Sequence, residues 1–257
     1  MYHLDFARVL LSLVMLGYAS WIDLKTREIY DLVWMVFGGI GLLLAAYEVY
    51  FGDLSLIGLL IQIVSSAVMA ILMGYVGLFG GADVGAFITL AILNPYPPMS
   101  IEPMLGIVSI IYPITLFSNS ALSGASFAFI ILAKNLSRSI RGEKLFEGQE
   151  TESPWKRLIV MVTGLKVGLD RVRGPPFQYP LELPSGSDEY GRRLVLLPDI
   201  NDDRAAEEIF LRLRDEGVDQ VWVSHTLPFI VFIFLGYVLT ILVGDIALSV
   251  IIRFFLR

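Results

Sequence analysis

The stretch LDFARVLLSLVMLGYASWID, residues 4–23, decides the fold class of this chain. From Leu4 to Ile22 it is mostly apolar, and as a helix rising about 1.5 Å per residue it is roughly long enough to cross a bilayer. No basic segment precedes it and no small-residue cleavage site follows it. We therefore predict a retained transmembrane helix that ends on an ionisable residue, Asp23.

The composition supports the same fold class. Of the 257 residues, 56% are hydrophobic and only 17% are charged, whereas soluble domains are about half apolar and about one quarter charged. The net charge of -6 argues against nucleic acid as a partner. The absence of cysteine excludes disulfides, thiolate catalysis and cysteine-ligated zinc. Two distant histidines argue against a histidine-rich metal site, so we predict no metal and no cofactor, with membrane lipid as a partner.

Hydrophobic runs predict an α-helical membrane protein with six transmembrane helices: Leu4–Ile22, Ile29–Phe51, Leu54–Leu78, Val84–Leu93, Met104–Ala133 and Leu227–Ile252. The fourth would cover only about 15 Å, half a bilayer, so it is either a short helix within the bundle or a tilted one. The fifth is long, and it is either one helix kinked at Pro113 or two half-spans. Pro228 is expected near the first turn of the sixth.

Residues 134–226, between the fifth and sixth runs, have a different character. They are rich in charge, and Lys156–Val167, Leu194–Leu197 and Val221–Val223 are predicted strands. Asp202–Arg214 is a predicted amphipathic helix, acidic at its start and basic at its end, which Gly217 stops. We expect a small α+β domain outside the membrane. The predicted division is therefore 1–133 membrane, 134–226 soluble and 227–257 membrane.

Lysine and arginine placement predicts the orientation. Lys25 and Arg27 place the first loop in the cytoplasm, and the loop around Gly52-Asp53 carries no basic residue and lies outside. The Gly77–Ala82 loop then returns to the cytoplasmic side, and the basic-rich inserted domain lies there too. Asp23 and Asp83 thus share the cytoplasmic boundary of a multi-pass protein of the cell membrane.

Asp23 and Asp83 are the candidate catalytic residues. Ionisable side chains next to hydrocarbon are costly and mark function by default. Two carboxyl groups at one depth can share a proton and activate water, which is the chemistry of an aspartic protease. Each also has a simpler interpretation: Asp83 as the N-cap of the fourth helix, and Asp23 as a solvated loop residue beside Lys25 and Arg27. Which of the two would be the base is left open.

Other acidic residues are weaker candidates. Asp245 lies in the last hydrophobic run, roughly 25 Å along the helix from Pro228, and is expected to have a packing role. A further group is expected at the outer interface: Asp5, Glu48, Asp53 and Glu102. Asp31 and Glu28 are cytoplasmic, and either could be a substrate-side charge. The glycines before Asp83, Gly80 and Gly81 among them, fit close helix packing or the approach of a peptide equally well.

At these residues the chain resembles the GxGD family of intramembrane aspartyl proteases, specifically archaeal preflagellin (prearchaellin) or type IV prepilin peptidases. The resemblance covers most of the chain. It rests on Asp23-Leu24-Lys25-Thr26-Arg27-Glu28-Ile29, on Gly80-Gly81-Ala82-Asp83, and on Val221-Trp222-Val223-Ser224-His225-Thr226-Leu227-Pro228-Phe229. Ala82 stands at the second glycine of the motif, and archaeal members are similar in accepting a hydrophobic residue there.

The resemblance implies an endopeptidase that removes a short basic leader from preflagellin and prepilin precursors, ahead of their hydrophobic helix, at the cytoplasmic boundary. Bacterial relatives carry a cysteine-rich zinc segment and also methylate the product. This chain has no cysteine, so we predict cleavage alone. The alternatives are a small proton- or cation-coupled transporter and a membrane assembly factor without catalysis. No inverted repeat is visible to favour the transporter.

Overall fold

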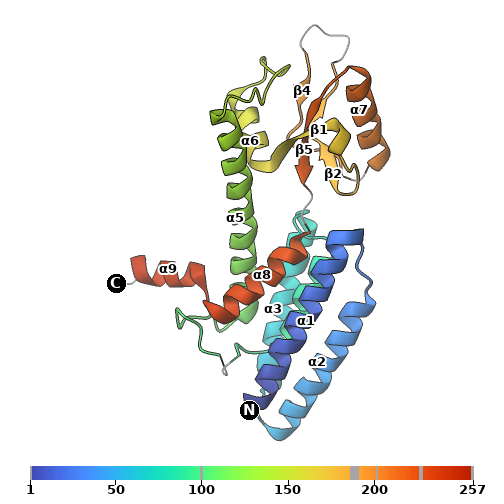
Figure 1. The fold of residues 1–257 in the computed structure, drawn as a ribbon. Coiled ribbons are helices and arrows are strands. Elements are labelled where there is room, and N and C mark those ends of the chain that lie inside the picture. Colours follow the sequence, from blue (N-terminus) through green and yellow to red (C-terminus); the bar gives the residue numbers. More distant parts are fainter. Residues whose placement is uncertain (1, 99–100, 186–190, 201, 226–227, 256–257) are drawn as a thin grey trace. The chain divides into compact units, whose positions relative to one another are not determined.

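The structure is a computed structural model that describes residues 2–98, 101–185, 191–200, 202–225 and 228–255. It divides into two compact units. Residues 1–124 and 228–257 form unit 1, and residues 125–227 form unit 2. Figure 1 shows unit 1 as helices and unit 2 as a small sheet with helices. The predicted boundary at 226 and 227 lies outside the described residues, and the domain division stays a prediction.

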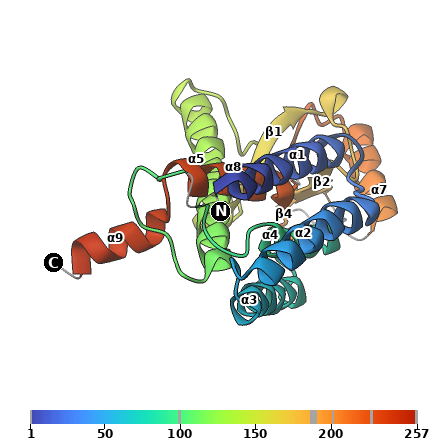
Figure 2. The same ribbon diagram turned by 90° about the horizontal axis from the view of Figure 1, so that it is seen from below.

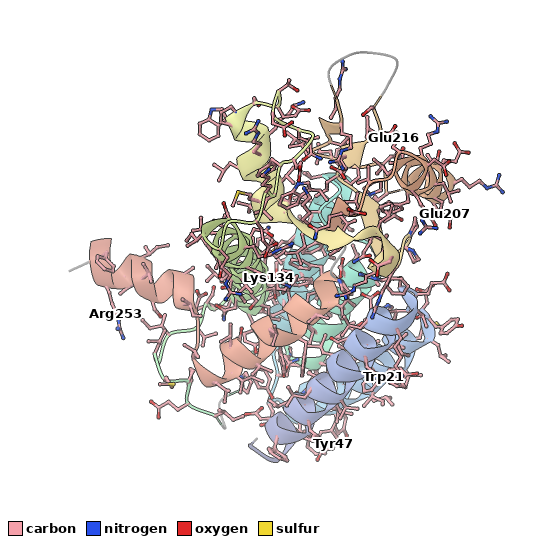
Figure 3. All side chains as sticks on the ribbon, turned by 45° about the horizontal axis from the view of Figure 1, so that its top comes forward. Trp21, Tyr47, Lys134, Glu207, Glu216 and Arg253 are labelled. Carbon is pink, nitrogen blue, oxygen red and sulfur yellow. The ribbon has the colours of Figure 1, made fainter. Side chains whose placement is uncertain are left out.

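Unit 1 is a helical bundle with α4 (Gly81–Leu93) at its centre. Helices α1 (Tyr2–Thr26), α2 (Leu32–Phe51), α3 (Leu56–Tyr75) and α8 (Phe229–Leu242) all contact α4. Figure 2 shows α4 beside α2 and α3. The outer faces are apolar and exposed, and Trp21 and Tyr47 belong to this surface (Figure 3). This is the pattern of a bundle whose outside faces lipid.

Four helices of the described part are long and apolar enough to span a membrane: Leu4–Thr26, Leu32–Phe51, Leu56–Tyr75 and Tyr112–Ile140. A fifth span results if the bent pair α8 and α9 (Ile246–Phe255) is counted as one. The α4 helix is apolar, but its 13 residues are too few to be included. The protein is thus a mostly helical membrane protein, and the six-span count stays a prediction.

Small residues bring α4 and α2 close together. A Cβ atom on Gly41 would lie 3.0 Å from an Ile92 side-chain carbon and 3.3 Å from the Leu93 nitrogen. One turn earlier, Gly38 faces Thr89. On the α3 side, Ser66 donates a 2.8 Å hydrogen bond to the Phe87 carbonyl oxygen. Close backbone approach through small residues is the usual way in which membrane helices pack, and here it holds α4 inside the bundle.

A buried ion pair fixes the far end of α4. The Arg8 guanidinium donates to the Leu93 carbonyl oxygen at 2.7 Å and to Glu48 Oε2 at 2.7 Å, and both charged side chains are 2% exposed. Tyr96 donates to the other Glu48 oxygen at 2.8 Å. Glu48 and Asp5, which we expect at the outer interface, are both buried within the protein. Arg8 satisfies the end of α4 where its own backbone carbonyls run out of partners.

The fifth hydrophobic run folds differently from either expectation. Residues 104–111 form no helix, and α5 (Tyr112–Ile140) begins next to Pro113. Proline in the first helical turn costs nothing, because the missing N–H would have no intrahelical partner there. The predicted kink at Pro113 is therefore wrong.

The last hydrophobic run is broken rather than continuous. Helices α8 and α9 meet at 53°, and Figure 1 shows α9 turning away from the line of α8. Gly244 sits between them at φ +97°, with the Ile107 carbonyl oxygen 2.6 Å from where a Cβ would be. Asp245 then caps α9, accepting the Leu248 N–H at 2.8 Å and the Thr115 hydroxyl at 2.6 Å. Asp245 thus has the structural role that we expect, but at a break and not within a continuous helix.

Unit 2 is built around β5 (Gln220–His225). It pairs antiparallel with β1 (Gly164–Gly168) on one side and β2 (Gln178–Pro180) on the other, and β3 (Glu182–Leu183) pairs with β4 (Arg193–Leu194). Alternate β5 residues serve two cores, as the two-residue period of a strand requires. Trp222 stacks on Phe146 at 5.1 Å, whereas Val221 and Val223 pack with residues of α7 (Asp203–Asp215).

Three predictions for unit 2 meet different outcomes. The helix at Asp202–Arg214 is confirmed: Asp202 accepts the Ala205 N–H at 2.9 Å, and Gly217 follows the helix at φ +73°. The strand at Val221–Val223 is confirmed too. The strand expected from Lys156 is wrong before residue 164, because α6 (Pro154–Thr163) occupies it and a 3-10 turn, η1 (Leu169–Arg171), follows β1.

Candidate active site

Asp23 lies inside α1, one turn from its end, and not in a solvated loop as the simpler interpretation has it. Its side chain is half-buried, and α1 ends at Thr26. The Thr26 hydroxyl donates to the Ile22 carbonyl oxygen at 3.1 Å, and the Arg27 N–H donates to the Asp23 carbonyl oxygen at 3.1 Å. The backbone that carries Asp23 is therefore held by the bonds that close the helix.

Asp83 is the third residue of α4 and is 8% exposed. Gly80 is the N-cap residue, so the interpretation of Asp83 as the N-cap is wrong by three positions. The Asp83 Oδ2 atom accepts the Gly80 N–H at 2.8 Å, which is the reciprocal half of a capping box. Glycine has no side chain to accept the Asp83 backbone N–H, so the other half of the capping box is absent.

The loop before Asp83 is held by one aromatic side chain. Gly77 turns the chain at φ +80°, and the N–H groups of Leu78 and Phe79 donate to the Met73 carbonyl oxygen at 2.9 and 3.3 Å. The buried Phe79 ring stacks on Phe87 at 5.2 Å and lies 4.9 Å from Phe229. These contacts join the start of α4 to α8. A Cβ atom added at Gly77 or Gly81 would meet nothing within 4 Å, so the space beside both glycines is open.

Asp23 and Asp83 lie on two helices that are in contact, α1 and α4. The two carboxyl groups are close enough to interact electrostatically. They come from separate helices and lie 60 positions apart in the sequence. Two carboxyl groups within interaction range cannot both ionise freely, so such a pair can hold one proton between them. This arrangement can both accept a proton from water and give one away.

Trp34 of α2 packs against α4 two residues after Asp83. Its indole ring lies against Gly85 of α4, where a Cβ atom would come within 2.7 Å of both Trp34 Cδ1 and Nε1. The ring is 9% exposed, and its N–H has no hydrogen-bond partner among the described residues. Sequence reasoning missed this residue. The signal available was a tryptophan near the start of the second hydrophobic run, opposite a glycine two positions after Asp83.

Sequence reasoning also missed Arg8 and Glu48. The signal was present, since a basic residue inside the first hydrophobic run needs a buried partner, and Glu48 in the second run supplies it. No group of three or more histidine, aspartate or glutamate side chains that could hold a metal ion occurs in the described part of the chain. The prediction of a site without metal or cofactor stays a prediction.

Unit 2 has a buried charged cluster of its own. The fully buried Glu182 side chain pairs with Arg192 at 3.2 Å and accepts a hydrogen bond from the Gln149 amide. Burial raises the pKa of Glu182 to about 7, against the opposing effects of Arg192 and Lys166. Burial also lowers the pKa of Lys166, whose ammonium donates to the Leu145 carbonyl oxygen at 2.5 Å. A cavity of about 690 Å³ with a mostly charged lining adjoins Lys166 and Arg192.

Comparison with known proteins places this chain among peptidases. Residues 10–133 match the type IV leader peptidase family, and residues 156–246 match archaeal peptidase A24 C-terminus Type II. The preflagellin peptidase of Methanococcus voltae is 27% identical over 91% of this chain and 93% of its own length. The preflagellin peptidase of Methanocaldococcus jannaschii is 28% identical over 88% of this chain and 89% of its own. The preflagellin peptidase of Methanococcus maripaludis is 26% identical over 92% and 94%.

Proposed function

Because this chain belongs to the type IV leader peptidase family, we propose that it is a membrane aspartyl endopeptidase in which Asp23 and Asp83 carry the chemistry. Its substrates are preflagellin and prepilin precursors with a short basic leader ahead of a hydrophobic helix. It cleaves between the two at the cytoplasmic boundary of the cell membrane.

The observation that supports the proposal is that α1 and α4 are in contact and that their two carboxyl groups, Asp23 and Asp83, interact electrostatically. Each comes from a different part of one matched region, residues 10–133. Both lie at an end of their helix, Asp23 in the last turn of α1 and Asp83 in the first turn of α4. A scissile bond at the membrane surface would meet the pair at a depth where water is also present.

In the proposed topology, α1 to α5 and the bent pair α8 and α9 make six spans. The charged turn after α1, with Lys25 and Arg27, lies in the cytoplasm, and so does the inserted domain of residues 134–226. Helix α4 is about 20 Å long at 1.5 Å per residue, which is less than a bilayer. The Arg8–Glu48 pair holds the Leu93 end of α4 within the bundle, so the opposite end, with Asp83, can reach the cytoplasmic surface.

The pair works by sharing one proton. The ionised carboxylate takes a proton from a water molecule, whose oxygen attacks the scissile carbonyl carbon. The protonated carboxyl hydrogen-bonds the carbonyl oxygen and stabilises the negative charge that develops there. When the tetrahedral intermediate collapses, the C–N bond breaks. The leaving amine then takes up the proton that the first carboxylate had removed from water. Both carboxyl groups then return to their starting states.

Charge supports a basic leader as the element recognised. The chain has a net charge of -6, so its surface attracts a positively charged segment at long range. We expect this attraction to weaken as salt is added, because screening shortens its reach to about 10 Å at 0.1 M.

Replacing either aspartate tests the proposal. Asp23→Asn and Asp83→Asn should each abolish removal of the leader from a precursor in isolated membranes. In either variant an amide replaces one carboxyl group, so the two side chains can no longer both accept and donate a proton. The control is Asp53→Asn, which changes an exposed carboxyl in the loop after α2 and should cleave normally. The readout is N-terminal sequencing of the product. Near-normal cleavage by either active-site variant would show that the pair is misassigned. If the unmodified protein does not cleave the precursor, the alternatives of a transporter or a non-catalytic assembly factor are favoured.

A further inference from the structure

The turn that joins α3 to α4 has a single buried side chain. Of its residues, 76–80, only Phe79 is buried, and the residues on either side of it, Leu78 and Gly80, are exposed. Gly80 and Gly77 leave the backbone of this turn conformationally free. The backbone bonds of Leu78 and Phe79 are made to α3, at the Met73 carbonyl oxygen. The position of the turn next to α4 therefore depends on what surrounds the Phe79 ring.

The Phe79 ring contacts aromatic rings from three helices. Phe87 belongs to α4, so its stacked contact with Phe79, at 5.2 Å between ring centres, moves with α4 itself. The other two rings come from different helices: Phe117 of α5 lies at 6.1 Å, and Phe229 of α8 lies at 4.9 Å. Tilted and offset ring pairs at such distances are favourable beyond the burial of their area. Phe229, the first residue of α8, thus makes the closest ring contact from outside the turn and α4.

One peptide group links Phe79 to Asp83. The N–H of Gly80 belongs to the peptide group between Phe79 and Gly80, and it donates to Asp83 Oδ2 at 2.8 Å. The location of the Phe79 residue therefore sets the location of this donor. Asp83 is 8% exposed, so protein contacts hold its carboxyl group more than solvent does. A displacement of the Phe79 ring would move the donor and change the orientation of the Asp83 carboxyl group.

We propose that Phe229 is a positioning residue for the reaction: its ring holds Phe79, and the N–H that follows Phe79 holds the Asp83 carboxyl group in place. This inference rests on the proposed function. Phe229 touches no reacting atom and acts through Phe79. Displacing a reacting group by about 1 Å costs up to roughly 100-fold in rate. Loss of the Phe229 ring should therefore lower kcat and leave KM unchanged, because the precursor still binds.

The test is the measurement of kcat and KM for cleavage of a precursor by the full-length protein in detergent. Phe229→Ala should lower kcat about tenfold with KM unchanged. Phe229→Tyr keeps the ring and should restore most of the rate that Phe229→Ala loses. Phe234→Ala is the matched control, because it truncates the same kind of side chain on the same helix and against the same hydrophobic core. Among the described residues Phe234 makes no ring contact with Phe79, so its kcat should stay near normal.

A double variant shows whether Phe229 acts through Phe79. If it does, Phe79→Ala combined with Phe229→Ala should lose no more rate than Phe79→Ala alone, because the second change removes a contact that is already lost. Phe229→Leu decides the matter if Phe229→Ala does not fold. It keeps apolar volume but has no aromatic face, and it should also lower kcat with KM unchanged.

The inference is overturned by a normal kcat in a folded Phe229→Ala or Phe229→Leu protein, by failure of Phe229→Tyr to restore the rate, or by an equal loss in Phe234→Ala. Losses that multiply in the double variant also overturn it, because Phe229 would then act independently of Phe79. So does a raised KM with a normal kcat, which would place Phe229 in precursor binding. If any of these results occurs while Asp83→Asn is inactive, the proposed function still stands. Cleavage by Asp83→Asn removes the proposed function, and this inference with it.

Discussion

Gly85 sets how closely α4 approaches α2 beside the candidate pair. The Trp34 ring fills the space that any larger residue would need, at 2.7 Å from a Cβ atom on Gly85. Asp83 lies two residues earlier on the same helix. A shift of α4 at Gly85 would therefore change the position of one reacting carboxyl relative to the other, and small displacements at a reacting centre are costly to rate.

Gly85→Ala should lower both stability and cleavage. The added methyl group cannot fit without moving α4 or the Trp34 ring, so we expect a loss of about 1 to 3 kcal/mol in the free energy of unfolding. Gly39→Ala is the control, since a Cβ at this α2 position meets nothing within 4 Å. Thermal unfolding in detergent and the rate of leader removal provide the measurements. Trp34→Leu in the Gly85→Ala background should restore part of the loss, and a Gly85→Ala protein with unchanged stability and rate would refute the tight contact.

At this scale the sequence predicts some residues and misses others for identifiable reasons. Asp23 and Asp83 are predicted as the site because each ends or begins an apolar run and the predicted topology of alternating loops places both on one side. The burial of Glu48 is not predicted because its partner, Arg8, lies 40 positions away in another helix. A buried charge is identified only when its partner is known, since pairing is what makes its burial possible.

At the scale of helices and strands, local signals decide how well the sequence works. Helix α7 is predicted well because it has a cap at Asp202, an amphipathic pattern and a glycine stop. Helix α6 is mistaken for a strand because its β-branched residues suggest one. A helix forms there instead because Ser153 caps it, accepting the Lys156 N–H at 3.4 Å, and because Pro154 suits the first helical turn. The break between α8 and α9 depends on a carbonyl from residue 107, which no local pattern reveals.

Strand β3 gives unit 2 a pH dependence through Glu182. Because burial raises its pKa to about 7 from 4.5, the folded state favours the protonated form. The stability that this group contributes is then fully present below pH 4.5 and is lost as the pH rises through about 7. The size of the loss is about 3 kcal/mol.

Hydrogen exchange of the β5 amides in the full-length protein should reveal this effect. Glu182→Gln is the matched comparison, because both proteins have the same intrinsic exchange chemistry at each pH. We expect the protection of the unmodified protein, relative to Glu182→Gln, to fall between pH 4.5 and 7. A ratio that stays constant over this interval would mean that Glu182 does not change its ionisation there.

At the scale of the whole molecule, the two units have separate hydrophobic cores. The largest core joins α1, α2, α4 and α8 of unit 1, a smaller cluster joins α2 and α3, and two cores surround β5 of unit 2. The predicted separation into membrane and soluble parts follows from composition, since charge is concentrated in residues 134–226. The neighbours of α4 cannot be predicted in the same way. Lipid-facing and helix-facing positions are equally apolar, so hydrophobicity alone does not tell which helices meet.

The proximity of positions 23 and 83 can be measured directly because the chain has no cysteine. The double variant Asp23→Cys, Asp83→Cys contains a single thiol pair, and it can be treated in native membranes with a short bifunctional thiol reagent. The control pair, Asp53→Cys with Asp83→Cys, joins the loop after α2 to the start of α4. We expect an intramolecular cross-link in the first pair and none in the second. If the first pair fails to cross-link although both thiols are reactive, Asp23 and Asp83 do not lie close together and cannot form the proposed catalytic pair.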